Sequence, residues 1–427
     1  MNKKRLLKLI AFLLFNATVI LIASKEKWKE KHLNCLSGQK ELEHQRGERP
    51  SSKIKTILFW NGPKRSELTV FGTGNDAFVQ HGCPASDCEI VNSPYQYSNR
   101  PLDSYDAILF NFNDEFWLTK RPQFQRRPHQ RFIFFTQEPP PSIEPINIAD
   151  YDGYFNWTMT YRMDSDIPLL YGRIQPKPSA PTTADEIRIK ISNATRQRLS
   201  KRTERKGTCY VAAMISHCET HGGREEYITQ LEKYIDVDIY GPCTDQMDTI
   251  LHCDRNELLS STPECYDMLE SKYKFYLSFE NSICPDYVTE KFFQIMAHDM
   301  VPVVYGGANY SRIAPAHSYI NALSYKPKEL AAYLKKLASN EVLYNEYFWW
   351  KGNYVVEAGL THMVRNSFCE LCRKLNDRDQ QVKIYASLSP QWDSVQCQRP
   401  KHRQMEKPLP LINLSTINML NYYFHRS

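Results

Sequence analysis

One short segment of the chain gathers polar and charged residues where a strand gives way to a helix. Residues 273–306 read YKFYLSFENSICPDYVTEKFFQIMAHDMVPVVYG. Apolar runs at both ends predict two strands, a polar turn at 280–282 ends the first, and a helix is expected to open near Asp286. In parallel α/β sheets ligands bind outside the carboxyl ends of strands, and a helix N-terminus suits a phosphate. Glu290 and Lys291 lie within reach, so the segment predicts a site for a phosphorylated ligand.

Two other residues have a similar placement at the end of an apolar run. Glu138 directly follows the run at 131–136, and Arg224 follows a strand expected to end near Ser216. A carboxylate at a strand end that faces a cleft can take a proton from a hydroxyl group. From position alone, an exposed loop carboxylate is the safer interpretation of Glu138. For Arg224 two interpretations are equally supported: a solvated arginine at a helix end, or a residue that binds an anion.

The elements that must position these residues form two series of short apolar runs. Gly, Pro, Asn or Asp residues bound the runs, as expected for buried strands. The first series comprises 54–60, 107–112 and 131–136, and the second comprises 209–215, 237–241 and the segment at 273. Between 172 and 207 a Pro/Ser/Thr-rich patch and a basic stretch predict a linker. The pattern therefore predicts two α/β halves with a cleft between them.

The N-terminus predicts a membrane anchor. Three basic residues at 3–5 precede a mostly apolar run at 6–23, whose length is near the lower limit of about 17 residues for a membrane span. The basic flank favours a cytosolic N-terminus. A cleaved signal peptide is the alternative, because Ala23 could end a cleavage site. The charged residues that follow, 24–52, predict a solvated stem.

Composition restricts the classes of function. The 427 residues are 42% hydrophobic and 12% aromatic with a net charge of +6, which allows real cores and disfavours wholesale disorder. No zinc-finger or RNA-binding signature supports a nucleic-acid partner. All 12 cysteines follow the apolar run, and an even number in a lumenal domain favours disulfides. The alternative to a disulfide role for Cys369 and Cys372 is that they form half of a zinc site, although the sequence has no second CxxC to complete such a site.

The segment 273–306 resembles the donor-site signature of the α1,3-fucosyltransferases. The matching residues are 279–282 (FENS), 286–291 (DYVTEK) and 301–304 (VPVV), with a further upstream match at 155–162 (FNWTMTYR) and 164–166 (DSD). The resemblance covers roughly 53–375. Gly306-Gly307-Ala308 replaces the family's usual glycine-proline turn, 137–140 differs around the base, and the tail past 375 is unfamiliar. These departures fit an invertebrate member.

The resemblance implies a GT-B-like α/β fold with two Rossmann-like domains facing a cleft, behind a single N-terminal transmembrane anchor. It implies a single-pass type II protein of the Golgi membrane with a lumenal catalytic domain. The implied segments are 1–5 as cytosolic tail, 6–23 as signal-anchor, 24–52 as stem, 53–200 as N-terminal acceptor-binding domain, 207–360 as C-terminal GDP-fucose-binding domain and 361–427 as a disulfide-containing tail.

The implied activity is inverting transfer of L-fucose from GDP-fucose to O3 of a GlcNAc residue on glycoprotein N-glycans. The implied general base is Glu138, and the implied donor-binding residues are Arg224, Glu280, Asn281, Tyr287, Glu290 and Lys291. Arg224 and Lys291 would hold the diphosphate, Glu290 would accept hydrogen bonds from ribose or fucose hydroxyls, and Tyr287 would contact the nucleotide. Asn281 has a second interpretation, as a residue that only holds the backbone of its turn.

The resemblance also bears on covalent modification and metals. It implies that Cys83 and Cys88 pair with Cys369 and Cys372. Four sequons occur beyond the anchor: Asn193 and Asn413 are the expected acceptors of N-linked glycan, whereas Asn156 and Asn309 are expected to be enclosed. The Asp-x-Asp pair at 164–166 could bind Mg²⁺ or Mn²⁺, but in this family it lies away from the diphosphate. No cofactor is therefore expected to be required, with stimulation by Mn²⁺ or Mg²⁺ left open.

Three alternatives remain at the level of function. The acceptor is either the innermost GlcNAc of an N-glycan core or an outer GlcNAc of an antenna, with the antenna slightly favoured by residues 273–279. A GT-B enzyme with another sugar nucleotide is the second alternative. A non-catalytic glycan-binding relative is the third, and it would be favoured had Glu138, Arg224 or Lys291 been replaced. The sequence does not predict the oligomeric state.

Overall fold

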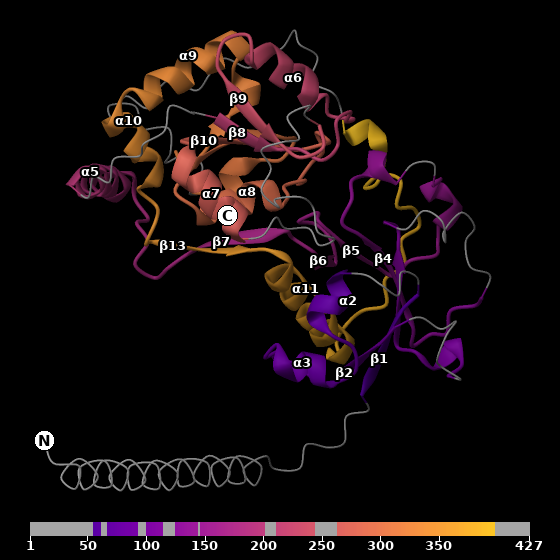
Figure 1. Ribbon diagram of the computed structural model, residues 1–427. Coiled ribbons are helices and arrows are strands. Elements are labelled where there is room, and N and C mark those ends of the chain that lie inside the picture. The colour runs from indigo at the N-terminus through magenta and orange to yellow at the C-terminus, as the bar shows by residue number, and fades with distance from the viewer. Residues whose placement is uncertain are drawn as a thin grey trace, which may run out of the picture. The chain divides into compact units, whose positions relative to one another are not determined.

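The computed structural model describes two α/β halves of one compact unit (Figure 1). The described residues are 54–60, 66–92, 100–113, 124–143, 146–200, 211–243 and 263–397. The predicted cytosolic tail, anchor and stem lie outside them. No helix within these ranges combines the length and apolar character that a membrane crossing requires.

The N-terminal half is built on a six-stranded parallel sheet with the order β2-β1-β3-β4-β5-β6. Its strands are β1 Lys55–Phe59, β2 Cys88–Asn92, β3 Ala107–Asn111, β4 Arg131–Thr136, β5 Trp157–Thr160 and β6 Ile167–Pro168. The central strands are continuous apolar runs because both faces of a parallel sheet are covered. Strands β3 and β4 pair with Phe110 opposite Phe134, and both side chains are fully buried.

The C-terminal half contains a five-stranded parallel sheet with the order β12-β11-β10-β8-β9. Its strands are β8 Val211–Met214, β9 Val237–Tyr240, β10 Phe275–Phe279, β11 Val301–Tyr305 and β12 Ile320–Asn321. The chain adds strands on one side of β8 and then on the other, so the strand order reverses between β8 and β10. Ligands of open parallel sheets bind at such a reversal, outside the carboxyl ends of the strands.

Helices cover both faces of this second sheet (Figure 1). Helices α6 Arg224–Leu231 and α9 Pro327–Ala338 share one core with alternate residues of β8 and β10, including Ala213 and Leu277. Helices α7 Pro263–Lys272 and α8 Glu290–Ala297 share a second core with Ala212 and Tyr276. This alternation follows from the two-residue period of a strand. The expected α/β class with parallel sheets is confirmed.

The segment predicted to be a linker contains regular structure. Strand β7 Gly172–Pro176 pairs antiparallel with β13 Tyr354–Ala358, and α5 Ala184–Ser200 packs against α10 Glu341–Asn345. Helix α5 therefore contacts the C-terminal half, although the sequence assigned 53–200 to the N-terminal domain. The predicted linker therefore contains a strand and a helix, and both are stabilised by partners that are distant in sequence.

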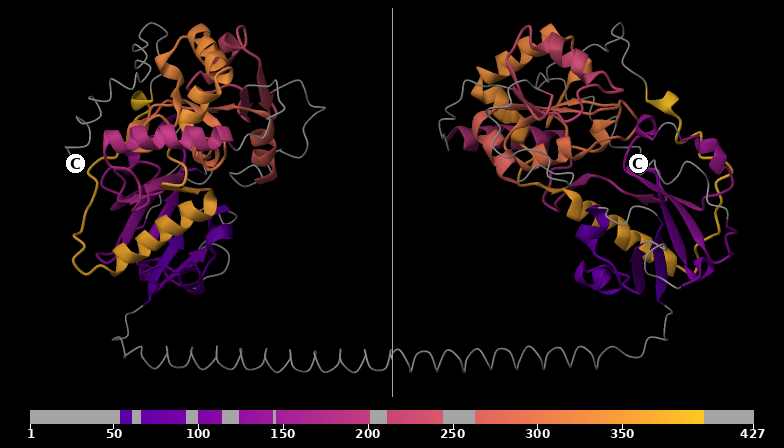
Figure 2. Two further views of the ribbon diagram at one scale, coloured as in Figure 1. Left: turned by 90° about the vertical axis from the view of Figure 1, so that its left-hand side faces the viewer. Right: turned by 45° about the vertical axis from the view of Figure 1, so that its right-hand side comes forward.

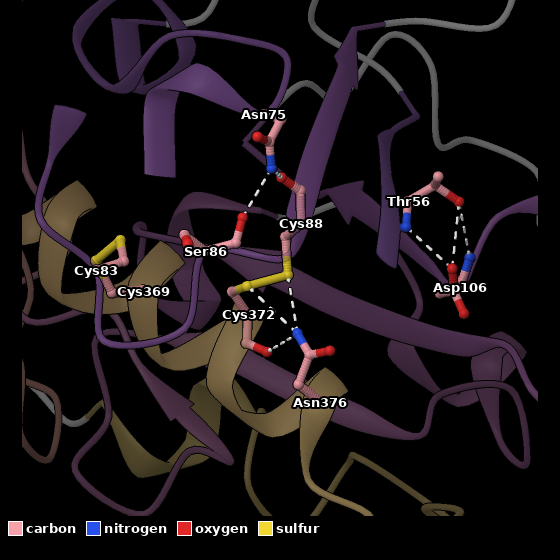
Figure 3. The surroundings of a disulfide bond; sticks show 9 residues. All are labelled: Thr56, Asn75, Cys83, Ser86, Cys88, Asp106, Cys369, Cys372 and Asn376. Carbon is pink, nitrogen blue, oxygen red and sulfur yellow. Dashed lines mark hydrogen bonds between the residues drawn. A yellow bond between two sulfur atoms is a disulfide. The ribbon is translucent and has the colours of Figure 1, made fainter. Parts of the chain in front are cut away.

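The last helix, α11 Leu360–Asn376, packs against α2 Ser66–Phe71 of the N-terminal half (Figure 2). Two disulfides hold it there, Cys83–Cys369 and Cys88–Cys372 (Figure 3). The structure thus joins the four cysteines that the family resemblance implied would pair, and leaves no free CxxC at 369–372 for zinc. The side chain of Asn376 donates to the backbone carbonyl of Cys372 at 3.0 Å and caps this corner (Figure 3).

The sequons differ in exposure. Asn156 is 1% exposed, and its amide is hydrogen-bonded to Phe132 and Lys383, so it is enclosed as expected. Asn309 is exposed and accepts hydrogen bonds from Ser311, so the expectation that it is enclosed is wrong. Asn193 is exposed on α5, and Asn413 lies outside the described residues.

We expect Asp299 to make stability depend on pH in the acid range. It pairs with Arg198 of α5 at 2.8 Å and with Lys351 at 2.9 Å. Burial alone would raise the pKa of Asp299, but the hydrogen bonds from Arg198 and Lys351 outweigh it and lower that pKa to about 2. The stabilisation is present above the unfolded pKa near 4 and is lost as the pH falls toward 2.

The replacement Asp299→Asn should therefore lower the free energy of unfolding at pH 7 by roughly 2 kcal/mol. Thermal unfolding of the variant and the unmodified protein measures this directly. The difference in melting temperature should narrow between pH 4 and pH 2. An equal difference across that range would contradict the account.

Candidate active site

The turn that follows β10 is organised around a buried carboxylate. Glu280 is fully buried, and its carboxylate accepts hydrogen bonds from the backbone N–H of Thr289 at 2.8 Å and from its hydroxyl at 2.9 Å. Both partners lie just before α8, so Glu280 closes the loop of residues 281–288 onto the end of the strand. The helix begins at Glu290, four residues later than the sequence predicted. Asp286 instead lies in the turn with φ +59°.

Lys291 lies in the centre of this acidic cluster. Its ammonium group donates to Thr289 Oγ1 and Glu290 Oε1, both at 3.0 Å, and lies 3.8 Å from Glu280 Oε2. Burial on its own would lower the pKa of Lys291, but the neighbouring Glu290 and Glu280 outweigh it and raise that pKa. Lys291 is therefore positively charged at neutral pH. Burial raises the pKa of Glu280, and Lys291 and the Thr289 hydrogen bonds oppose that rise.

Arg224 connects this turn to the end of β8. Its side chain is 2% exposed, and its guanidinium donates to the carbonyl oxygens of Phe279 at 2.8 Å and His217 at 3.1 Å. Within the described part of the chain its Nε is buried without a hydrogen-bond partner. Burial lowers the pKa of Arg224, and the charge of Glu280 opposes this. Arg224 thus holds the two strand ends together at the reversal of strand order, and its contact with a diphosphate stays a prediction.

Asn281 lies against the loop that precedes α6. Its carbonyl oxygen accepts a hydrogen bond from the N–H of Gly222 at 2.7 Å. A Cβ at Gly222 would lie 3.0 Å from that oxygen, so a glycine permits this close approach. The side-chain oxygen of Asn281 is buried and has no hydrogen-bond partner within the described ranges. Asn281 therefore supports its turn through the backbone and leaves a side-chain acceptor unused.

Glu138 comes from the other half of the molecule and is the second residue after β4. It is half-buried, and its backbone N–H is directed to Thr136 Oγ1 at 3.1 Å and to Asn113 Oδ1 at 3.3 Å. Asn113 Oδ1 also accepts from the N–H of Gln137 at 3.1 Å. Asn113 shapes the turn that presents the carboxylate, and sequence reasoning missed it. Its position directly after the apolar run at 107–112 was the available signal.

Tyr287 joins the two halves at the site. Its hydroxyl donates to Glu138 Oε2 at 3.4 Å. Burial raises the pKa of Tyr287 well above its ordinary value, so it stays a neutral phenol that can donate. The ring of Tyr161 packs edge-on against it at a centroid distance of 4.8 Å, and Tyr171 lies behind at 6.3 Å. We call residues 280–288 the donor turn, after the role that the sequence predicts for them. Glu138 and the donor turn meet at a buried aromatic wall formed by Tyr161, Tyr171 and Tyr287.

A cavity lies next to this wall. It has a volume of about 200 Å³ and is lined in part by Tyr161, Asp286, Val288, Arg173 and Arg312. Asp286 also accepts a hydrogen bond from the backbone N–H of Met163 at 3.2 Å. The cavity thus adjoins both the donor turn and the strand end that packs against Tyr287.

Both carboxylates of the Asp-x-Asp pair accept hydrogen bonds from protein side chains. Asp164 forms two hydrogen bonds of 2.8 Å with Arg162, which lower the pKa of that carboxyl. Asp166 accepts from Tyr385 at 2.7 Å and from Lys383 at 3.0 Å. Within the described residues the grouping that could hold a metal ion lies elsewhere, at Asp267, Glu270 and His298. That grouping lies near the C-terminal end of α8, at the opposite end from Lys291.

Comparison with known proteins gives consistent matches over most of the chain. The family model "Fucosyltransferase, N-terminal" matches residues 52–172, and "Glycosyltransferase family 10 (fucosyltransferase) C-term" matches 203–392. Alpha-(1,3)-fucosyltransferase C of Drosophila melanogaster is 36% identical over 363 residues, which cover 82% of this chain and 81% of the relative.

Two further matches are weaker. Glycoprotein 3-alpha-L-fucosyltransferase A of Drosophila melanogaster is 32% identical and is matched over 80% of this chain and 61% of its own length. The crystal structure of an α1,3-fucosyltransferase with GDP-fucose aligns over 79% of this chain and 95% of its own, at 14% identity and a TM-score of 0.47.

Proposed function

Because the chain belongs to the α1,3-fucosyltransferases of glycosyltransferase family 10, we propose that it transfers L-fucose from GDP-fucose to O3 of a GlcNAc residue on glycoprotein N-glycans, with inversion at the anomeric carbon. The name of the second Drosophila relative supports a glycoprotein acceptor. Two α/β halves with parallel sheets support a GT-B arrangement in which the C-terminal half binds the donor.

One observation carries the proposal. Lys291, Glu280 and Glu290 form a cluster of charged residues at the reversal of strand order in the C-terminal sheet. Tyr287, in the loop that leads into α8, donates a hydrogen bond to Glu138 of the other half at 3.4 Å. A nucleotide diphosphate at this position would meet the charged Lys291 and the N-terminal end of α8. The acceptor hydroxyl would meet the carboxylate of Glu138. Tyr287 therefore brings Glu138 next to the loop that leads to Lys291.

Each of these residues has a separate role in a single-displacement transfer of fucose. Glu138 takes the proton of the acceptor O3 as the new glycosidic bond forms. Lys291, with Arg224 behind it, stabilises the negative charge that develops on the departing GDP. Glu280 keeps Lys291 in place through Thr289, and Glu290 is available to hydroxyls of the ribose or fucose. Tyr161, Tyr171 and Tyr287 form a wall that shields the oxocarbenium-like centre from water.

The acceptor is tested by incubating the purified full-length protein with GDP-fucose and defined N-glycans. One group of acceptors should offer only the core GlcNAc and another only an antenna GlcNAc. We propose the antenna as the better substrate, since residues 273–279 resemble the antenna-modifying members of the family. Faster transfer to the core group would reverse this assignment. Transfer from a different sugar nucleotide alone would reject the proposed donor.

We expect transfer to persist in EDTA at within about twofold of the untreated rate. Lys291 supplies a fixed positive charge at the expected diphosphate position, and the carboxylates of Asp164 and Asp166 are hydrogen-bonded to protein donors. The measurement is the initial rate of GDP release before and after chelation, with and without added Mn²⁺. Complete loss in EDTA and recovery with Mn²⁺ would show that a metal ion is required.

We propose that residues 6–23 anchor the protein in the Golgi membrane in type II orientation, with the catalytic part in the lumen. Disulfides such as Cys83–Cys369 and Cys218–Cys243 support this, because they form in the oxidising secretory pathway. Protection of the catalytic part from protease in sealed microsomes would test the orientation. Digestion without detergent would contradict it.

A further inference from the structure

The segment after α11 runs back along the N-terminal half toward the active site. We call residues 377–397 the strap; Figure 2 traces it in yellow from the end of α11. Its backbone pairs with the loop before β5: the N–H of Tyr385 donates to the carbonyl of Phe155 at 2.9 Å, and the N–H of Gly153 donates to the carbonyl of Tyr385 at 3.1 Å. The strap is therefore a fixed part of the fold over this stretch.

The Asp-x-Asp motif holds the strap in place. Asp166 accepts hydrogen bonds from the hydroxyl of Tyr385 at 2.7 Å and from the ammonium of Lys383 at 3.0 Å. The same carboxylate accepts from the backbone N–H of Thr158 at 3.0 Å. Asp166 thus joins the strap to strand β5, which gives this motif a role that needs no metal ion.

Farther along the strap, Trp392 packs against two aromatic residues that lie near Glu138. Trp392 is 4% exposed, and its ring lies 5.1 Å from Phe134 and 5.4 Å from Tyr161. Phe134 lies in β4, four residues before Glu138. Tyr161 packs against Tyr287, whose hydroxyl contacts Glu138. Trp392 therefore contacts β4, the strand that leads to Glu138, and Tyr161, the residue that packs against Tyr287.

The strap ends in a covalent link to the donor turn. Cys397 forms a disulfide with Cys284, which is fully buried and whose carbonyl accepts the N–H of Tyr287 at 3.3 Å. On its other side the turn meets Gly307, where a Cβ would lie 2.7 Å from the carbonyl oxygen of Cys284. The turn that carries Tyr287 is thus confined between β11 and the strap.

We propose that the strap is a positioning element of the active site, which fixes Tyr287 against Glu138 through Trp392 and the Cys284–Cys397 disulfide. This inference depends on the proposed role of Glu138 as general base. The hydrogen bond from Tyr287 to Glu138 is already long at 3.4 Å, so a small displacement of either side breaks it. The contacts of Lys291 with Glu280, Glu290 and Thr289 lie outside this path. Loss of the strap should slow the chemical step more than it weakens donor binding.

The test uses the purified full-length protein and three changes on one path. These are the double replacement Cys284→Ser with Cys397→Ser, Trp392→Ala, and Tyr287→Phe, which keeps the ring but removes the hydroxyl. We expect the first two to lower kcat about tenfold and to change the Kd for GDP, measured by calorimetry, by less than about threefold. Trp392→Phe should restore most of the lost rate because it keeps the contact with Phe134 and Tyr161. Val395→Ser, an exposed change on the same strap, should have no effect.

A double-mutant cycle separates positioning from general stability. Combined with Tyr287→Phe, removal of the disulfide should cause little further loss, because both changes break the same contact. Fully multiplicative losses, an unchanged kcat, or a loss confined to the Kd for GDP would each overturn the proposal. If the disulfide variant does not fold, the kcat and the Kd for GDP of Trp392→Ala and Trp392→Phe test the proposal without it. If the unmodified protein transfers no fucose from GDP-fucose, the proposed function fails instead, so the two failures are distinguishable.

Discussion

Replacing Glu138 with Gln should lower kcat by about 10²- to 10⁴-fold while leaving the affinity for GDP within about threefold. The amide keeps the size of the side chain and can still accept from Tyr287, but it cannot take a proton from the acceptor. Donor binding should survive because Glu138 lies in the N-terminal half, whereas Lys291 and Arg224 lie in the C-terminal half. Initial rates at saturating acceptor and calorimetry with GDP measure the two quantities.

The matched control for this change is Glu89→Gln. Glu89 forms an ion pair with Arg100 at 2.6 Å at the edge strand β2 of the same sheet. A surface pair of this kind contributes at most about 1 kcal/mol to stability, so transfer should be unaffected. Near-normal turnover of the Glu138→Gln variant would remove this residue from the mechanism.

Replacing Lys291 with Ala should lower kcat/KM by about 10²- to 10³-fold. The change removes the positive charge from a cluster in which Glu280 and Glu290 remain, so a diphosphate would meet two uncompensated carboxylates. Affinity for GDP should fall roughly 10- to 100-fold, since a hydrogen bond to a charged group contributes about 1.5–3 kcal/mol. Calorimetry with GDP and steady-state rates measure the two parts of the effect.

Two comparisons make this second result specific. Lys291→Arg keeps the charge but spreads it over a larger planar group, and it should recover part of the affinity. Lys233→Ala removes an exposed lysine whose ammonium group donates to Gln230 at 2.7 Å, and it should change neither the rate nor the affinity. Unaltered binding of GDP to the Lys291→Ala protein would exclude Lys291 from the donor site.

The sequence predicted the strands better than the segments between them. The apolar runs at 275–279 and 301–304 correspond to β10 and β11, because strands buried on both faces must be apolar throughout. The start of α8 was placed too early, at Asp286. An acidic residue is common before a helix, but Asp286 adopts φ +59° and accepts from Met163. Met163 belongs to the other half of the molecule, so no pattern near Asp286 in the sequence predicts this hydrogen bond.

Part of the site also depends on contacts that no local pattern contains. The turn residue Glu280 was recognised, but its burial and its two hydrogen bonds with Thr289 follow only from closure of the loop. Arg224 was expected beside the ligand, and its contact with the carbonyl of Phe279 requires the pairing of β8 with β10. The donor turn was therefore identified by its residues, whereas the way these residues support one another was not.

Long-range links were the least predictable. Spacing alone cannot give disulfide connectivity. The tail is expected to contain disulfides, but nothing in the sequence predicts that Cys397 pairs with Cys284 of the donor turn. The composition of residues 172–207 predicts a linker, but β7 forms within it by pairing with β13, which is remote in sequence. In both cases a segment with no strong pattern of its own acquires its structure from a distant partner.

The central claim is that the turn after β10 binds guanosine diphosphate while Glu138 acts from the opposite half. The most direct measurement is a calorimetric titration of GDP into the folded full-length protein and its Glu138→Gln and Lys291→Ala variants. We expect saturable binding with a Kd between about 1 μM and 1 mM, similar in Glu138→Gln and at least about tenfold weaker in Lys291→Ala. Absence of binding to the folded unmodified protein, or equal affinity in all three, would contradict the account.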